Sequence, residues 1–293
     1  MAVSLPEPAS GFYTSKHLKL HYTDWGNPDA PLLLMLHGGL EHSRVWDPLA
    51  QALRDRYHVV CPDLRGHGDS EWCTGGLYSV LDSVMDMVFL VRHLGKRPSV
   101  MMGHSWGGNV AVRYTAICPD DVTHLISIEG LSHFTTQDDT LLPGTRLIKL
   151  RNWLKEQEKL EGKQPRRYAD IASAVDRLHA GYPRVERAFV EHIVRHGVRK
   201  NDDGTLSWKY DDMVRSGSPS DITQKELEQL WASIACPVLL IYGGKSWASN
   251  PAKDGRAALF QNARVELVEE AGHNIHHEQP EHSRKIISEF LAG

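Results

Sequence analysis

Ser105 lies at the centre of the sequence GHSWG at positions 103–107, which fits the pattern G-x-S-x-G. A short apolar run precedes it, and residues 109–117 follow with a helical pattern. A serine on such a sharp strand-to-helix turn projects its hydroxyl from the carboxyl end of a sheet. The turn leaves little room for side chains two residues before and two residues after the serine. We therefore predict that Ser105 is a nucleophile for acyl transfer.

A serine hydroxyl is a weak nucleophile and needs a neighbouring base. His273 lies in the sequence EAGHN at 270–274, after the last predicted strand and before the last predicted helix. A loop in this place lies at the same edge of a parallel sheet as Ser105, so we predict His273 as the general base. His276 and His277 are nearby competitors, which we expect to face away from the nucleophile.

The base needs a carboxylate to hold its tautomer. Glu129 directly follows the predicted strand 125–128, whereas the loop after strand 238–242 has no carboxylate before Asp254. We therefore predict Glu129 as the acid, and the chain order serine, acid, histidine agrees with that choice. Three other carboxylates stay open as alternatives: Asp254, Asp138 and Asp139.

Acyl transfer also needs hydrogen-bond donors for the developing oxyanion. The N–H of Trp106, next to the nucleophile, can supply one donor. The sequence HGGL at 37–40 follows an apolar strand, and its glycines allow the backbone to approach a substrate closely. We predict the N–H of Gly39 as the second donor, with Leu40 as the next choice.

Alternating strand and helix patterns surround these residues and predict an α/β fold with a parallel sheet covered on both faces. The predicted strands are 32–36, 58–61, 100–102, 125–128, 238–242 and 265–268, and the predicted helices are 45–56, 80–94, 109–117, 252–260 and 280–291. Residues 132–230 break this rhythm with polar helical patterns, so we predict a helical cap there and a core of 1–131 and 231–293. Five cap aromatics could line a substrate cavity or pack the cap onto the core: Trp153, Tyr168, Tyr182, Trp208 and Tyr210.

Composition excludes several classes of protein. The 293 residues include 33 Lys and Arg against 37 Asp and Glu, a net charge of −4, so we expect no nucleic-acid partner. No apolar run approaches the 18 residues of a membrane helix, and the first residues lack a signal-peptide pattern, so we expect a cytoplasmic protein with no membrane partner. The four cysteines lie far apart and predict free thiols. Whether the chain forms a homodimer stays open.

Two histidines, His192 and His196, are spaced four residues apart on a predicted helix and could face a metal ion together. The sequence shows no third ligand at a useful spacing and no H-E-x-x-H pattern, so we predict no metal site.

Together these motifs resemble the α/β-hydrolase fold superfamily. The similar segments are HGG at 37–39, DLRGHGDS at 63–70, GHSWGG at 103–108 and AGH at 271–273. The resemblance implies a mostly parallel eight-stranded sheet with a helical cap and no cofactor. Many members carry the acid after the strand that corresponds to 238–242. This chain looks like the subgroup with the acid one strand earlier, as in haloalkane dehalogenases and the serine hydrolase-like proteins.

The predicted reaction is hydrolysis of a small carboxylic ester or related acyl compound through a Ser-His-Glu triad and an acyl-enzyme. The sequence at 104–106 also resembles the dehalogenase and epoxide-hydrolase elbow, with serine in place of the nucleophilic aspartate, which argues against both of those activities. Hydrolysis of a C–C bond, lactone, amide or thioester by the same triad stays open, as do cofactor-free perhydrolysis and a ligand receptor or inactive scaffold on this fold.

Overall fold

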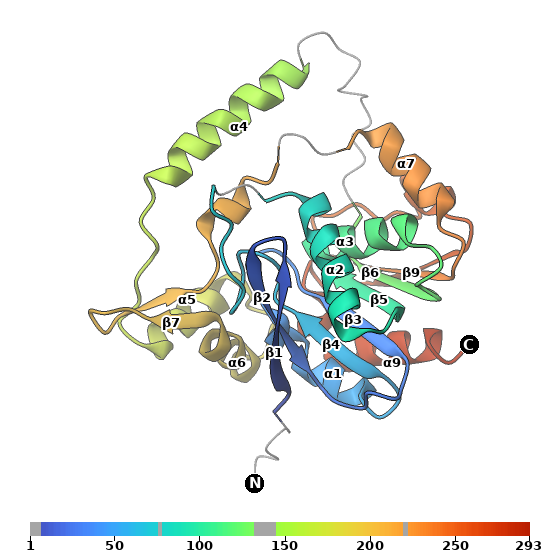
Figure 1. The fold of residues 1–293 in the computed structure, drawn as a ribbon, viewed down its shortest axis with the longest axis horizontal. Helices are drawn as coiled ribbons and strands as arrows, with labels where there is room; N and C mark the ends of the chain where they lie inside the picture. Colours follow the sequence, from blue (N-terminus) through green and yellow to red (C-terminus); the bar gives the residue numbers. More distant parts are fainter. Residues whose placement is uncertain (1–6, 76–77, 132–144, 219–221) are drawn as a thin grey trace.

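The computed structural model describes residues 7–75, 78–131, 145–218 and 222–293 (Figure 1). Its centre is an eight-stranded sheet in the order β1-β2-β4-β3-β5-β6-β9-β10. The neighbours from β4 to β10 are parallel, while β1 and β2 add an antiparallel edge. The strands are β1 (Ala9–Ser15), β2 (Leu18–Asp24), β3 (Leu32–Leu36), β4 (His58–Pro62), β5 (Pro98–His104), β6 (His124–Ile128), β9 (Val238–Gly243) and β10 (Ala263–Val268). This architecture confirms the predicted fold class.

Helices cover both faces of the sheet, which explains why the central strands are apolar throughout. In β3, Leu32, Leu34 and Leu36 pack into one core, whereas Leu33 and Met35 pack into the core on the opposite face. The first core includes residues of α2 (Val80–Leu94), α3 (Ser105–Ile117) and α7 (Gln224–Ser233), and the second includes residues of α1 (Asp47–Leu53) and α9 (Pro280–Phe290). Figure 1 shows α2 and α3 in front of the central strands. The carboxyl ends of the parallel strands are left to loops.

Two elements differ from the prediction. The hairpin of β1 and β2 has no predicted counterpart, because its first strand is mostly exposed and lacks a continuous apolar run. The predicted helix 252–260 is wrong: turns and the short 3-10 helix η3 (Arg256–Leu259) occupy that stretch. Gly255 there has φ of 90°, which no α-helix accommodates.

The segment between β6 and β9 is largely helical, as the sequence indicates. It contains α4 (Thr145–Glu161), α5 (Ile171–Gly181), α6 (Arg187–Gly197), the hairpin strands β7 (Val198–Lys200) and β8 (Leu206–Trp208), the 3-10 helix η2 (Asp212–Arg215) and α7. A separate small apolar core joins α5 and α6, and α4 extends along the outside of the molecule (Figure 1). Helix α7 instead inserts Leu227 and Trp231 into the main core. The proposed boundaries of the cap therefore stay a prediction.

Local capping defines where several of these helices begin. Asp170 and Ser173 form a reciprocal capping box at the start of α5, and Thr223 and Glu226 form another at the start of α7. All four cysteines are free thiols, as predicted. Within the described ranges, no helix has both the length and the apolar character needed to span a bilayer.

Candidate active site

Ser105 occupies a sharp elbow between β5 and α3, since the strand ends at His104 and the helix begins at Ser105 itself. Its φ of 49° lies in the left-handed region, which is uncommon for residues other than glycine. A Cβ on Gly103 would lie 2.3 Å from the carbonyl oxygen of Gly107, and one on Gly107 would lie 2.3 Å from that of Leu36. The prediction that both flanking positions must be free of side chain is confirmed.

The structure brings Glu129 and His273 together. The Nδ1 atom of His273 lies 2.7 Å from Oε2 of Glu129, although the two residues are 144 positions apart. Glu129 directly follows β6, and its side chain is completely buried. The His273 ring lies 4.8 Å from the ring of His104, the neighbour of Ser105, measured between centroids. The His273 ring therefore packs against the residue that precedes Ser105, at the carboxyl edge of the sheet.

The last residue of β9 and the loop after it supply donors to the buried carboxylate instead of an acid. The N–H of Gly243 donates to Oε1 of Glu129 over 2.7 Å, and the hydroxyl of Ser246 donates to Oε2. Trp247 from the same loop packs its ring 4.8 Å from that of His273. Sequence reasoning missed Ser246 and Trp247, and the only signal for them was the absence of a carboxylate from this loop.

The alternative acids take different places. The carboxylate of Asp254 bonds the guanidinium of Arg256 over 2.8–3.1 Å and also accepts the hydroxyl of Ser249. The hydrogen bonds of the Asp254 carboxylate are therefore made within its own loop. Asp138 and Asp139 lie outside the described residues.

The predicted oxyanion donors surround the same space as Ser105. A cavity of about 290 Å³ is lined by Gly39, Leu40, Ser105 and Trp106, among others. Leu40 has φ of 67°, so the loop after β3 adopts a strained turn at this point. The backbone hydrogen bonds of the described residues leave the N–H groups of Gly39 and Leu40 unused. Both groups are therefore available to a bound oxyanion.

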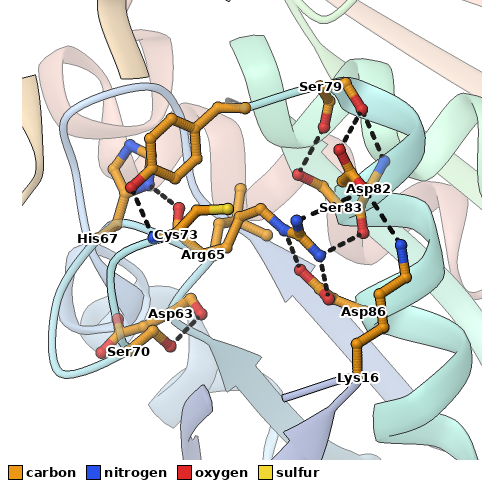
Figure 2. Close-up of polar contacts among 12 residues, drawn as sticks. Lys16, Asp63, Arg65, His67, Ser70, Cys73, Ser79, Asp82, Ser83 and Asp86 are labelled. Carbon is orange, nitrogen blue, oxygen red and sulfur yellow. Dashed lines mark hydrogen bonds and ion pairs between the residues drawn. The ribbon is translucent and has the colours of Figure 1, made fainter. Parts of the chain in front are cut away.

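The turn at 63–70 forms the wall of this cavity without supplying a free charge. Figure 2 shows the guanidinium of Arg65 facing Asp86, which it contacts through two hydrogen bonds of 2.7 Å. His67 also lines the cavity, and burial lowers its pKa to about 3, so its ring is neutral. Both residues therefore support the structure of the loop.

A second cavity, of about 700 Å³, extends under the segment between β6 and β9. It shares Gly39, Leu40 and Arg215 with the smaller cavity, so the two spaces meet beside Ser105. Among the aromatics considered for substrate binding, four line this larger cavity: Tyr168, Tyr182, Trp208 and Tyr210. Trp153 lines neither cavity, and its indole N–H donates to the carbonyl of Gly217.

His276 and His277 lie in a buried group around His104. The rings of His104 and His276 are 4.6 Å apart between centroids, and Glu41 lies 3.3 Å from Nδ1 of His104. Burial lowers the pKa of His276 well below its ordinary value and that of His277 to about 4, so both imidazoles are neutral. Neither hydrogen-bonds Glu129 within the described part of the chain. Of His273, His276 and His277, only His273 lies at hydrogen-bond distance from the carboxylate of Glu129.

Comparison with known proteins places this chain in a family. The model of the alpha/beta hydrolase fold matches residues 31–280. The chain belongs to that family. It is 26% identical over 275 residues to an esterase of Mycobacterium tuberculosis, covering 91% of this chain and 84% of the relative. It is also 26% identical over 274 residues to a mouse sn-1-specific diacylglycerol lipase, covering 91% of this chain and 83% of the relative.

Solved structures agree on the fold. The crystal structure of E-2-(acetamidomethylene)succinate hydrolase superposes with a TM-score of 0.79 at 24% identity, covering 98% of this chain and all of that one. The motifs that resembled this superfamily are therefore those of a true member. With named esterases, lipases and hydrolases among its relatives, the protein is a hydrolase.

Proposed function

We propose that the protein hydrolyses a small carboxylic ester or a related acyl compound through Ser105, His273 and Glu129. The observation that carries the proposal is the 2.7 Å bond between Glu129 and His273, whose ring lies 4.8 Å from that of His104, the residue before Ser105. An imidazole held by a buried carboxylate, next to a serine on a strained elbow, is the arrangement that activates a hydroxyl for acyl transfer. The names of the esterase and lipase relatives support the same substrate class.

Acylation begins with a proton transfer. Because Nδ1–H of His273 is held by Glu129, its Nε2 is the acceptor that takes the proton of Ser105 as Oγ attacks the carbonyl carbon. The carbonyl oxygen becomes an oxyanion, which accepts hydrogen bonds from the N–H groups of Trp106 and Gly39, with Leu40 as the alternative donor. The carbonyl re-forms as the C–O bond to the leaving group breaks. His273 then protonates the departing alkoxide.

Deacylation repeats these steps with water as the nucleophile. Nε2 of His273 takes a proton from the water, whose oxygen attacks the acyl carbon and forms a second oxyanion in the same place. Its collapse breaks the bond to Oγ, and His273 returns the proton to Ser105. The balance is one ester and one water consumed, and one carboxylic acid and one alcohol released.

Substrate size follows from the two cavities. The space beside Ser105 is about 290 Å³, and the space under the proposed cap is about 700 Å³. We propose that the smaller one receives the part of the substrate next to the reacting carbonyl. Tyr168, Tyr182 and Trp208 contact the more distant part in the larger one.

A fluorophosphonate probe tests the nucleophile. The purified protein is expected to be labelled at Ser105 in one-to-one ratio, and Ser105→Ala is expected to abolish both labelling and hydrolysis of nitrophenyl acetate. Ser83→Ala is the matched control, because Ser83 lines the same cavity and bonds only a backbone carbonyl. Labelling that survives Ser105→Ala would contradict the assignment. A nitroanilide of the same acyl group that is cleaved faster than the ester would contradict the substrate class.

A further inference from the structure

Behind the proposed triad lies a compact group of possible metal ligands that the proposed reaction does not use. Glu41, His104 and His276 each offer one ligand atom, and these atoms all lie within 4.8 Å of one another. His277 adds a fourth, with its Nδ1 3.9 Å from Oε1 of Glu41. The three histidine side chains are more than nine-tenths buried.

The hydrogen bonds of His104 create an unusual contact. Its Nε2 lies 3.1 Å from the backbone carbonyl of His273, and a carbonyl oxygen can only accept, so Nε2 carries the proton. In a neutral ring Nδ1 is then an acceptor, yet it faces Oε2 of Glu41, also an acceptor, at 3.3 Å. Two acceptors at that distance need either a proton or a metal ion between them.

His276 and His277 point to the metal ion. Both ring nitrogens of His276 and the Nε2 of His277 are buried and have no hydrogen-bond partner within the described part of the chain. Burying such groups unpaired is costly, and an additional proton on His104 would leave all of them unpaired. A metal ion can accept a lone pair from His276 while it also bridges Glu41 and His104.

We propose that Glu41, His104 and His276, with His277 as an additional ligand, form a binding site for a divalent transition-metal ion of the Zn²⁺ type. Imidazole and carboxylate are ligands that Zn²⁺ prefers, at about 2.0–2.2 Å. Two such ligands on a tetrahedral ion lie about 3.4 Å apart, close to the 3.3 Å between Glu41 and His104. The bond from Nε2 of His104 to a carbonyl is the outer contact that commonly orients a metal-binding histidine.

The neighbours of the proposed metal site indicate how an ion enters it and what effect its binding has. Glu41 and His277 line the larger cavity, so an ion can enter from there. Glu41 also accepts the N–H of Gly38 over 2.7 Å, and His104 contacts the His273 carbonyl. Because the three ligand atoms lie up to 4.8 Å apart, an ion that draws His276 toward Glu41 and His104 therefore shifts the histidine loop that carries His273. Resting on the proposed function, we infer that occupancy inhibits hydrolysis.

Two other groups of ligand atoms are less suitable. Asp47, His192 and His196 supply the third ligand that the sequence did not show. There, however, the guanidinium of Arg44 already bonds Asp47 over 2.7 Å and faces His196 over 3.3 Å, so a positive charge occupies the site.

The third group is His21, Asp63 and Asp69. The carboxylate of Asp63 accepts bonds from His21, from the N–H of Ser43 and from the N–H of Asp69. It therefore has no unsatisfied charge to offer an ion.

Direct binding tests the proposal without relying on turnover. The full chain is stripped with a chelator, and Zn²⁺ binding is measured by calorimetry, with Co²⁺ as a spectroscopic probe of imidazole and carboxylate ligands. We expect one tight equivalent, which Glu41→Gln and His276→Gln each weaken at least about tenfold. The double variant His192→Gln, His196→Gln is the matched control and is expected to keep that equivalent. Circular dichroism and thermal melts establish that each variant is folded.

The outcomes separate the alternatives. The proposal is overturned if the wild-type chain binds no tight equivalent of Zn²⁺, and the contact between Glu41 and His104 is then assigned to a protonated His104. The proposal is also overturned if tight binding persists in both Glu41→Gln and His276→Gln. Loss of tight Zn²⁺ binding in the control variant would indicate that the ion binds at Asp47, His192 and His196 instead, which contradicts the proposal. Labelling of Ser105 by the fluorophosphonate in metal-free protein tests the proposed function separately. Failure of the metal-site proposal is therefore distinguishable from failure of the proposed function. Inhibition by Zn²⁺ in the control and not in Glu41→Gln would support the inferred consequence.

Discussion

Replacing Glu129 by glutamine is the most informative perturbation of the proposed triad. The carboxylate accepts three hydrogen bonds, from Nδ1 of His273, from the N–H of Gly243 and from the hydroxyl of Ser246. An amide of the same shape has one acceptor oxygen and one NH₂ group. In either orientation the NH₂ therefore faces a group that is itself a donor in the native protein.

The size of the effect on kcat depends on which of these donors the NH₂ group faces. If the NH₂ faces His273, the imidazole must turn its unprotonated nitrogen toward residue 129, and its Nε2 then carries a proton and cannot accept one from Ser105. The comparable substitution in chymotrypsin-like proteases lowers kcat about 10⁴-fold, or about 5.5 kcal/mol of activation free energy. If the NH₂ faces Gly243 instead, the tautomer survives at the cost of a buried donor–donor contact, about 1–3 kcal/mol of stability.

We therefore expect Glu129→Gln to lower kcat for a nitrophenyl ester by 10²- to 10⁴-fold, with little change in KM, because the residue does not line either cavity. Asp254→Asn is the matched control, since its carboxylate bonds Arg256 and lies outside the proposed site. It is expected to retain kcat within about threefold while losing stability. Near-normal turnover by folded Glu129→Gln protein, or a collapse of kcat in the control, would refute the choice of Glu129.

Three further outcomes are expected. Ser246→Ala removes one neutral donor from the carboxylate of Glu129 and should lower kcat by about tenfold, measured with the same ester; an unchanged kcat would show that the hydroxyl is not used. Gly107→Ala places a Cβ 2.3 Å from a backbone oxygen and should lower the free energy of unfolding by several kcal/mol or prevent folding, as monitored by urea denaturation, whereas normal stability would contradict the tight elbow. Asp63→Asn breaks a buried pair with His21 and should lower the free energy of unfolding by about 3 kcal/mol at pH 7. Although burial alone raises the pKa of Asp63, the hydrogen bond and charge of His21 lower it below its ordinary value. The stabilisation by that carboxylate is therefore present above pH about 4 and is lost on acidification. The difference in free energy of unfolding between wild type and variant should accordingly be smaller at pH 3 than at pH 7. A larger difference at pH 3 would contradict this direction of the pKa shift.

Much of the site could be predicted because each part is a short segment at a defined place on the sheet. The elbow, the histidine loop and the residue after β6 each follow an apolar strand, and parallel strands bring their carboxyl ends to one edge. That rule placed the candidate loops at one edge, and the absence of a carboxylate from the loop after β9 selected Glu129 as the partner of His273. Their hydrogen bond depends on side-chain positions that no local pattern encodes.

Other parts depended on contacts between distant segments. The hydroxyl of Ser246 bonds a residue 117 positions away, and the histidine group joins Glu41 to His276 across most of the chain. The predicted helix at 252–260 failed because Gly255 adopts a left-handed φ and Asp254 bonds Arg256 instead of solvent. Tertiary hydrogen bonds outweigh helix propensity in a stretch this short.

The shared oxygen of Glu129 has a consequence for how such enzymes diverge. Ser246 and His273 both contact Oε2, so the loop after β9 already reaches the point from which the imidazole is held. A carboxylate that arose by mutation in this loop would meet the same ring nitrogen while Glu129 was still in place. An ancestor with both acids could then lose either one and stay active. The proposed acid can in this way migrate between adjacent strands during evolution, while the proposed nucleophile and base stay where they are.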